Sequence, residues 1–347
     1  MTTERNPAGL RGIEFVEFCG PDPEFMDRTF KAFGFSKVMR HTGKAIDYYE
    51  QNHIRFLLNR QPESFAQQFG ERHGPSICSM GWRVDDAEVA MEWALDNGAR
   101  RYDAEAETKC LDVPAIYGIG DSLIYFIETF GRRGSPYTSE YTDLEEPEIV
   151  EDKGFLTIDH LTNNVFKGTM EEWADFYKNV FGFTEVRYFD IKGEETGLKS
   201  YALQSPAGGF CIPINEGTEE KSQIEEYLRE YDGPGIQHLA FLSSDLLASL
   251  DKLEGSGIET LDIADDYYES VYDRVPNVTE DRVRIHHHNV LIDGDDDGYL
   301  LQIFTRNLFG PIFIELIQRK NHKSFGEGNF QALFDSIERD QRRRGVL

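Results

Sequence analysis

Residues 235–258 read GIQHLAFLSSDLLASLDKLEGSGI, and residues 76–99 read SICSMGWRVDDAEVAMEWALDNGA, with equivalent positions 159 residues apart. Each run pairs an apolar strand-like segment with a segment of helical periodicity. A shorter match supports the comparison, because AFGF at 32–35 is followed much later by VFGF at 180–183. The chain therefore contains an internal repeat, and this repeat decides the expected fold.

The elements expected around these runs follow one order in both halves. Asp22 is expected to cap a helix that has Pro23 in its first turn. Thr169 and Glu172 are expected to form a capping box for a helix that ends near Phe181. A βαβββ unit repeated within each half, and again between the halves, is the simplest account and gives an α+β fold. The expected strands are 12–18, 35–41, 45–50, 54–59, 76–84, 122–130, 156–165, 183–191, 198–204 and 210–215, and the expected helices of the first half are 23–33, 63–72 and 86–97.

A chain of 347 residues is long enough for about two domains of ordinary size. We expect one domain over 1–131, a linker over 132–152 and a second domain over 153–347. The linker sequence, RRGSPYTSEYTDLEEPEIVED, has almost no apolar periodicity. The second domain is expected to end in a helix that begins at Asn329 and docks through one face, formed by Phe330, Leu333, Phe334 and Ile337.

The bulk composition restricts the partners of the protein. A formal charge of −27 repels nucleic acids and anionic lipids, so the expected partner is a small molecule. No uninterrupted apolar stretch approaches the roughly 20 residues of a membrane helix, and the start, MTTERNPAGL, has no apolar signal core. The scattered positions of the four cysteines, Cys19, Cys78, Cys110 and Cys211, suggest a reducing compartment. We therefore expect a soluble, cytoplasmic protein.

Glu315 stands in an apolar strand-like run, GPIFIELIQRK at 310–320. An ionised carboxylate there needs a proton, a cation or hydrogen bonds to offset the cost of burial. His160 and His238 lie in two other apolar runs. His160 precedes His238 by 78 residues, and His238 precedes Glu315 by 77 residues. Two imidazoles and a carboxylate are the ligand set of non-haem Fe(II) oxygenases, and zinc accepts the same ligands.

The repeat shows where such a metal site can exist. When the two halves are aligned, His160 matches Phe15 and His238 matches Ser79. Glu315 in FIEL matches Glu128 in FIET. The first half lacks both histidines, so we expect the metal site in the second half alone.

Two further runs resemble metal sites but are expected to be ordinary structure. DGDDDG at 293–298 fits the opening of a calcium loop, but Phe304 stands where the bidentate glutamate would be, so a hairpin turn is expected. His286, His287 and His288 are adjacent, and adjacent residues of a strand or loop rarely converge on one ion. Hydrolysis by a nucleophilic serine is not favoured, because the G-x-S-x-G motif is absent.

With these residues in view, the chain resembles the 4-hydroxyphenylpyruvate dioxygenase family of the vicinal oxygen chelate superfamily. The likeness covers nearly the whole chain and is most specific in IDHLTNNV, PINE, GIQHLAF, LLQIF, FGPIFIELIQRK and FGEGNF. It implies two open barrels of βαβββ modules, with Fe(II) held by His160, His238 and Glu315 in the second barrel. The first barrel is expected to be free of metal and to support assembly as a dimer or tetramer. The implied reaction converts 4-hydroxyphenylpyruvate, a 2-oxo acid, and O2 to homogentisate and CO2 in tyrosine catabolism.

The same resemblance implies roles for residues around the substrate. Ser200, Asn215, Gln237 and Gln302 are expected in the catalytic polar network, with Gln223 binding the substrate. Phe304 and Phe330 are expected to sandwich the aromatic ring, Phe313 and Phe325 to wall the site, and Asn329 to join the substrate contacts. The C-terminal helix is expected to close over the site as a lid. Ordinary readings also exist, because phenylalanines are core residues by default.

Three other functions fit parts of the pattern. 4-Hydroxymandelate synthase resembles the same motifs and uses the same substrate and metal, but it hydroxylates the benzylic carbon. An extradiol catechol dioxygenase is disfavoured by the FGEGNF helix. A non-catalytic small-ligand binder of the superfamily does not need the two histidines and the glutamate together.

Overall fold

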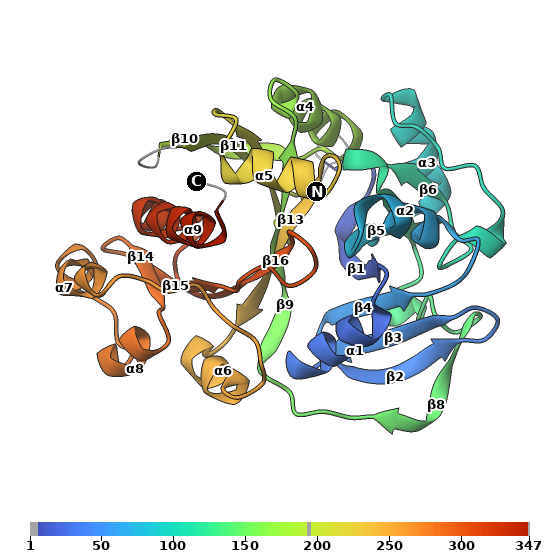
Figure 1. Cartoon of the computed structure of the whole chain (residues 1–347). Helices are drawn as coiled ribbons and strands as arrows, with labels where there is room; N and C mark the ends of the chain where they lie inside the picture. The colour runs from blue at the N-terminus through green and yellow to red at the C-terminus, as the bar shows by residue number, and fades with distance from the viewer. Residues whose placement is uncertain (1–5, 193–195, 346–347) are drawn as a thin grey trace.

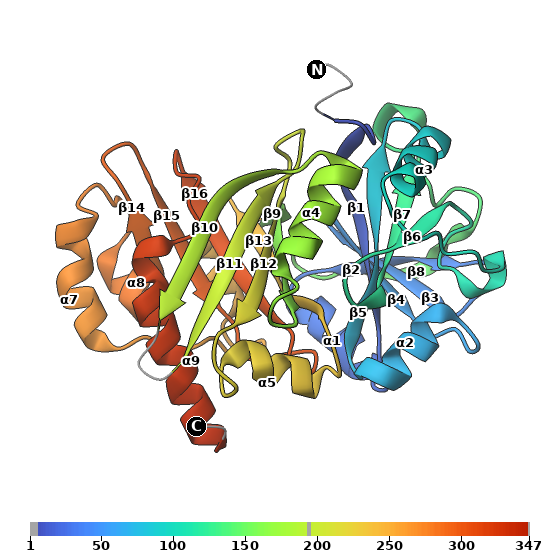
Figure 2. The same cartoon turned by 90° about the horizontal axis from the view of Figure 1, so that it is seen from above.

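The computed structural model describes residues 6–192 and 196–345. Residues 1–5, half of the start considered above, lie outside this description. The described chain forms two eight-stranded sheets, one in each half, which lie side by side (Figures 1 and 2). None of the helices in the described ranges is long and apolar enough to cross a membrane.

The first sheet has the strand order β6-β7-β5-β1-β4-β3-β2-β8. Its strands are β1 (Leu10–Cys19), β2 (Ser36–His41), β3 (Ile46–Gln51), β4 (Ile54–Asn59), β5 (Ser76–Val84), β6 (Ala115–Tyr117), β7 (Leu123–Ile127) and β8 (Tyr141–Glu148). The helices of this half are α1 (Pro23–Ala32), α2 (Phe65–His73) and α3 (Ala87–Asp96), with 3-10 turns at Ala106–Thr108, Ile119–Asp121 and Gly131–Arg133.

The second sheet has the order β10-β11-β12-β9-β13-β16-β15-β14. Its strands are β9 (Phe155–Val165), β10 (Thr184–Lys192), β11 (Gly197–Gln204), β12 (Cys211–Gly217), β13 (Gly235–Ser243), β14 (Leu291–Gly294), β15 (Tyr299–Phe304) and β16 (Phe313–Lys320). The helices are α4 (Met170–Phe181), α5 (Gln223–Glu230), α6 (Leu246–Leu253), α7 (Asp265–Arg274), α8 (Arg282–His287) and α9 (Phe330–Arg344), the last preceded by a 3-10 turn at Glu327–Asn329.

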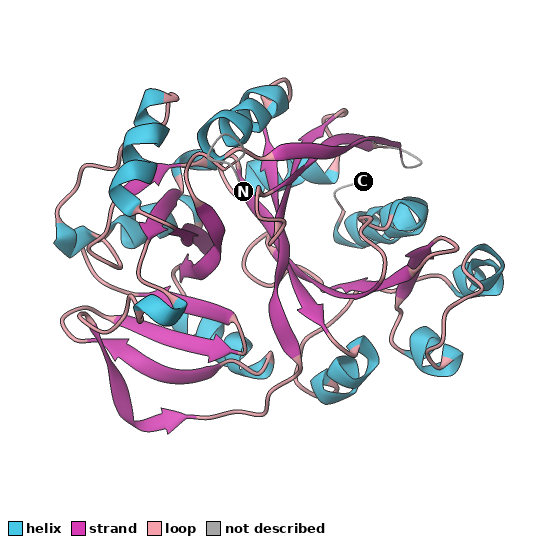
Figure 3. Ribbon diagram, turned by 180° about the vertical axis from the view of Figure 1, so that it is seen from behind, coloured by secondary structure: helices cyan, strands magenta, loops and turns pink. Residues whose placement is uncertain are grey.

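The pairing of strands repeats between the halves. β1 pairs in parallel with β4 and antiparallel with β5, and β5 pairs in parallel with β7. In the second half β9, β12, β13 and β16 have the same relationships. The predicted α+β fold of tandem βαβββ modules is confirmed. Most helices pack outside the sheets, whereas α9, beside the C label in Figure 3, lies within the curve of the second sheet.

The predicted linker is wrong for part of its length. Residues 141–148 form β8, which pairs antiparallel with β2 at the edge of the first sheet. Most of its side chains are exposed, so the strand carries no apolar alternation by which it could be recognised.

The predicted helix caps have different outcomes. Asp22 caps α1, because its side chain accepts a hydrogen bond from the backbone N–H of Phe25. The predicted capping box of α4 is wrong, since the Thr169 hydroxyl donates to the Phe166 carbonyl and does not cap the helix. Asn329 occupies the cap position of α9 but makes no capping hydrogen bond, so that prediction is also wrong.

Aromatic side chains from both halves share one buried core. Trp82 of β5 is fully buried and packs edge-to-face on Phe181 and Phe210 of the second half. On the same interface, Phe241 of β13 contacts Phe33 and Phe35 of the first half. Burying such large apolar surfaces is strongly favourable, so the first half supports the second.

Candidate metal centre

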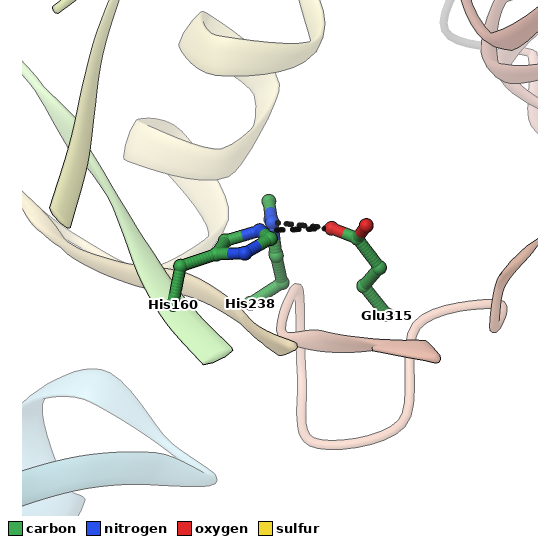
Figure 4. A group of neighbouring side chains, drawn as sticks. All are labelled: His160, His238 and Glu315. Carbon is green, nitrogen blue, oxygen red and sulfur yellow. Dashed lines mark hydrogen bonds and ion pairs between the residues drawn. The ribbon is translucent and has the colours of Figure 1, made fainter. Parts of the chain in front are cut away.

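His160, His238 and Glu315 converge inside the second sheet (Figure 4). Oε2 of Glu315 lies 2.9 Å from Nε2 of His160 and 3.4 Å from Nε2 of His238. The three residues are 3%, 8% and 3% exposed, and one ligand atom from each lies within 4.8 Å of the others. The chain thus places two nitrogen donors and one oxygen donor around one buried point.

The strand register explains this convergence. Ala240, in the middle of β13, pairs with His160 of β9 on one side and with Glu315 of β16 on the other. His238 precedes Ala240 by two residues and therefore points to the same face of the sheet. Three adjacent strands thus direct the three side chains to one place.

The electrostatics of the cluster keep Glu315 and His160 charged and favour a neutral His238. Burial alone would raise the pKa of Glu315, but the neighbouring imidazoles of His160 and His238 lower that pKa to about 2. Burial alone would lower the pKa of His160, but the carboxylates of Glu315 and Asp159 raise it to about 9. Burial lowers the pKa of His238. The carboxylate of Glu315 is therefore ionised and shares a proton with His160. A metal cation would occupy the position of that proton.

His160 is oriented from behind by Asp159 and Arg319. Nδ1 of His160 lies 2.8 Å from Oδ2 of Asp159, and Arg319 donates to both oxygens of that carboxylate at 2.8 Å. Despite burial, these partners hold the pKa of Asp159 well below its usual range. With Nδ1–H donating to Asp159, Nε2 of the ring is directed at the centre.

His238 is oriented by its own neighbours. Its Nδ1 lies 3.1 Å from Oε1 of Gln237, and its ring stacks on Phe313 with centroids 4.7 Å apart. Oγ1 of Thr162 lies 3.0 Å from Nε2 of His238. Thr162 was not predicted, although it follows His160 by two residues and therefore shares its face of β9.

A cavity of about 670 Å³, counting the part open to solvent, lies directly over the triad. The structure brings together nearly all the predicted substrate residues in its wall: Ser200, Asn215, Gln223, Gln237, Gln302, Phe304, Phe313, Phe325 and Phe330. Further wall residues that the sequence did not single out include Thr162, Phe189, Ile191, Leu198 and Pro213. The mixture of aromatic and amide side chains suits a planar ring that carries polar ends.

Asn329 is the predicted substrate residue that the structure places elsewhere. It does not line the cavity, and it is fully buried. Its side-chain oxygen accepts hydrogen bonds from the Tyr267 hydroxyl at 2.7 Å and from Arg274 at 3.2 Å. Asn329 therefore ties the start of α9 to α7 and does not face the cavity.

Gln302 has a side-chain oxygen directed at Gly326, in the segment that leads into α9. Its Oε1 is buried without a hydrogen-bond partner in the described structure. A Cβ added to Gly326 would lie only 2.3 Å from this atom, so the glycine backbone passes directly over Gln302. A buried polar atom without a partner favours a ligand that donates a hydrogen bond.

The equivalent place in the first half is filled by apolar and aromatic side chains. Gly81 of β5 pairs with Phe15 and Tyr125, as Ala240 pairs with His160 and Glu315. Tyr125 is thus the structural counterpart of Glu315, and its ring lies 6.0 Å from that of Phe15. The predicted equivalence of Glu315 with Glu128 is wrong.

Glu128 has a different counterpart, Gln318. The Glu128 carboxylate accepts a hydrogen bond of 2.9 Å from the backbone N–H of Ala87, the first residue of α3. Gln318 accepts one of 2.6 Å from Leu246, the first residue of α6. Both side chains bind the start of an equivalent helix. Among the described residues, no cluster of potential metal ligands lies in the first half.

The acidic run at 293–298 is a hairpin turn, as predicted. It joins β14 to β15, and the backbone N–H of Asp295 donates to the carbonyl of Gly298 at 2.9 Å. The Asp293 carboxylate is bound by Arg274 at 2.5 Å, and Oδ1 of Asp295 accepts from the N–H of Asp297. These carboxylates therefore have partners within the protein.

Comparisons with known proteins agree with this geometry. The family model described as "Hydroxyphenylpyruvate dioxygenase, HPPD, N-terminal" matches residues 4–142, and the Glyoxalase/Bleomycin resistance protein/Dioxygenase superfamily model matches 157–303. Protein MelA of Shewanella colwelliana is 63% identical, with 100% of both chains covered. The 4-hydroxyphenylpyruvate dioxygenase of Legionella pneumophila is 44% identical, with 99% of this chain and 98% of the relative covered.

A solved structure gives the same fold. A mutant of 4-hydroxymandelate synthase from Streptomyces coelicolor superposes with a TM-score of 0.81 at 25% identity, with 96% of this chain and 99% of that chain covered. Full-length identity of 44% to a named dioxygenase, together with the match of the first half to the family's N-terminal model, goes beyond a shared fold. This chain therefore belongs to the 4-hydroxyphenylpyruvate dioxygenase family.

Proposed function

We propose that the protein is a 4-hydroxyphenylpyruvate dioxygenase, which converts 4-hydroxyphenylpyruvate and O2 to homogentisate and CO2 in tyrosine catabolism. The observation that carries the proposal is the buried cluster of His160, His238 and Glu315 beneath a cavity of aromatic and amide side chains. The full-length relative named 4-hydroxyphenylpyruvate dioxygenase supports the substrate.

We propose Fe(II) as the metal. Two neutral-imidazole nitrogens and one carboxylate oxygen on one side of a site are the donor set that suits Fe(II) and leaves other positions open. The fit is supported by the ionised, buried Glu315, whose oxygen has both histidine Nε2 atoms within 3.4 Å. Zinc accepts the same donors, so the choice of iron rests on the family. When bound, Fe(II) supplies the redox chemistry with O2 that protein side chains lack.

The residues of this chain bind and shield the substrate. Phe304 and Phe330 line the cavity, as does Phe325, and they offer flat apolar surfaces for the ring. Gln302 offers an acceptor, its unpartnered Oε1, to a donor group of the ligand such as a phenol hydroxyl. Gln237 holds His238 through Nδ1 and so fixes the direction of its Nε2. We propose that these residues, with Ser200, Asn215 and Gln223, position the 2-oxo acid.

α9 closes the cavity against water. Leu333, Phe334 and Ile337 line the cavity from the side of the helix. Exclusion of water protects reactive species and strengthens the electrostatic contacts of the site. The dimer or tetramer expected from the family stays a prediction.

4-Hydroxymandelate synthase is the second candidate, favoured by the structural match to that enzyme. The two reactions share a substrate and differ in the carbon that is hydroxylated. Incubation of the protein with Fe(II), O2 and 4-hydroxyphenylpyruvate, followed by mass spectrometry and chromatography of the product, separates them. Homogentisate supports our proposal, whereas 4-hydroxymandelate would replace it with the second candidate. Unchanged substrate with a correctly folded, iron-loaded protein would favour a non-catalytic binder.

The metal assignment has its own test. Replacing His160, His238 or Glu315 by alanine is expected to abolish turnover and to lower iron content from about one per chain. Glu128→Gln is the matched control, because Glu128 lies in the first half, and the amide oxygen can still accept from Ala87. Iron content and turnover at the wild-type level in any triad variant would overturn the assignment.

A further inference from the structure

We propose a second divalent-cation site, formed by Glu254, His287 and His288 on the surface of the second half. These residues lie at the C-terminal ends of α6 and α8, which are neighbours in Figure 1. One ligand atom from each of the three lies within 4.8 Å of the others. The adjacent histidines were expected in a strand or loop, where they would rarely converge. In the structure, they lie at the end of α8.

The contacts within the cluster place nitrogen and oxygen donors together. Nε2 of His287 lies 2.8 Å from Oε1 of Glu254, and the two histidine rings have centroids 4.8 Å apart. Nε2 of His288 lies 2.8 Å from Oδ1 of Asp251, so a further carboxylate borders the site. Each imidazole is thus held against a carboxylate, an arrangement in which a cation can replace the shared proton.

The backbone supplies a second, independent reason for a cation here. Glu254 is the C-cap of α6, and His288 is the C-cap of α8. Helix C-termini carry partial negative charge from their free carbonyl groups, so two such ends attract a cation to the space between them. Arg284 binds Asp251 at 2.5 Å and offsets its charge, so Glu254 is the carboxylate available to a cation, with His287 and His288.

The donor set indicates the class of cation. Two imidazoles and a carboxylate suit Zn²⁺ and related transition metals, whereas Ca²⁺ and Mg²⁺ prefer oxygen ligands alone. The site is open on one side, since the side chains of His287 and Glu254 are 65% and 58% exposed, whereas that of His288 is 8% exposed. Water would complete the coordination. A bound cation would pin α8 to α6 and stabilise this part of the second half.

The experiment uses the full-length, iron-loaded protein without a polyhistidine tag. It is equilibrated with micromolar Zn²⁺, and both metals are counted per chain by elemental mass spectrometry. Wild type is expected to take up about one zinc while keeping its iron. The double variant His287→Ala/His288→Ala is expected to bind zinc at least about tenfold more weakly, because it loses two of three ligands. Glu254→Gln is expected to weaken binding as well.

His286→Ala is the matched control. His286 belongs to the same histidine run, but its Nε2 contacts Asp265, 2.8 Å away, and not Glu254. It should bind zinc as wild type does, and zinc should raise the melting temperature of both proteins but not that of the double variant. Equal zinc uptake by wild type and the double variant would overturn the proposal. So would zinc uptake matched by an equal loss of iron, since that result places zinc at the triad.

Discussion

Arg319 donates two hydrogen bonds of 2.8 Å to Asp159, and that carboxylate lies 2.8 Å from Nδ1 of His160. The same guanidinium donates to the backbone carbonyl of Ser324 at 2.6 Å. Ser324 directly precedes Phe325, a wall residue of the cavity. One arginine therefore connects the orientation of a metal ligand to the segment that leads into the C-terminal helix.

Asp159→Asn is expected to lower the affinity for the triad metal by roughly 10- to 100-fold, as is typical when the partner of a ligating histidine is changed. The amide keeps the shape of the side chain but not its charge, so it holds the Nδ1–H of His160 less firmly. The measurement is equilibrium competition for the metal against a chelator. Arg319→Lys is expected to have a smaller effect of the same sign, because lysine cannot form the paired contact.

Lys320→Ala provides the control for the Asp159 and Arg319 variants. Lys320 is the next residue of β16, and its amino group binds Glu280 at 2.6 Å. Because successive strand residues face opposite sides, the change should leave metal affinity unaltered. Affinities of Asp159→Asn and wild type that agree within about twofold would contradict the proposed orientation of His160.

Gly326→Ala is expected to raise KM for 4-hydroxyphenylpyruvate and to destabilise the protein. The residue has φ of +80°, and its new Cβ would lie 2.3 Å from Oε1 of Gln302, so that side chain would be displaced. Gly168→Ala is the matched control, with φ of +86° and no atom within 4 Å of the added Cβ. Both variants should lose about 1–2 kcal/mol of unfolding free energy through backbone strain. Steady-state kinetics should show a raised KM in Gly326→Ala alone. Equal KM values in the two variants would contradict a contact between Gln302 and the substrate.

Much of the site could be predicted from the sequence, because a polar residue within an apolar strand is unusual and easily recognised. His160, His238 and Glu315 each interrupt an apolar strand, and such a residue needs a partner. The repeat then indicated the half that could hold a metal. The assignment of Glu128 failed because FIET and FIEL share letters but not register: strand pairing aligns Tyr125 with Glu315. Register depends on hydrogen bonds between distant strands, which a local match of letters does not contain.

Other errors arose where the local pattern carries little information. β8 is an exposed edge strand, so its sequence resembles a linker. Asn329 stands at the start of a helix, where a capping role is expected from local rules. Its actual partners, Tyr267 and Arg274, belong to α7, which the sequence pattern did not reveal. A tertiary contact thus outweighed the local preference of the asparagine.

Millimolar Ca²⁺ is expected neither to raise the melting temperature more than Mg²⁺ does nor to change activity. Asp293 is bound by Arg274, and Asp295 closes the turn through backbone N–H groups, so neither is free to bind calcium. Thermal unfolding and calorimetry with each cation provide the test. Tight binding of one Ca²⁺ per chain that is lost in Asp295→Ala would show that the turn is a calcium loop.

Phe330→Ala is expected to weaken substrate binding and turnover while sparing the metal. Phe330 is the first residue of α9; its ring lies 5.1 Å from that of Phe189, and both rings line the cavity. The far end of α9 is held by Gln341, which donates to Glu226 of α5 at 2.8 Å, so the helix should stay docked. Removing an aromatic surface that contacts a ligand costs about 1.5–3 kcal/mol.

Such a loss corresponds to a fall in kcat/KM of roughly 10- to 150-fold. Phe166→Ala is the control, because it removes the same side chain from the second half at a position that is 52% exposed and does not line the cavity. Iron content, oxygen uptake and homogentisate should be measured together on both variants. Because the altered helix no longer excludes water fully, Phe330→Ala should also consume more oxygen per homogentisate formed. Wild-type kcat/KM and a wild-type ratio of product to oxygen would show that α9 only covers the core, whereas loss of iron along with activity would place Phe330 in the support of the metal centre.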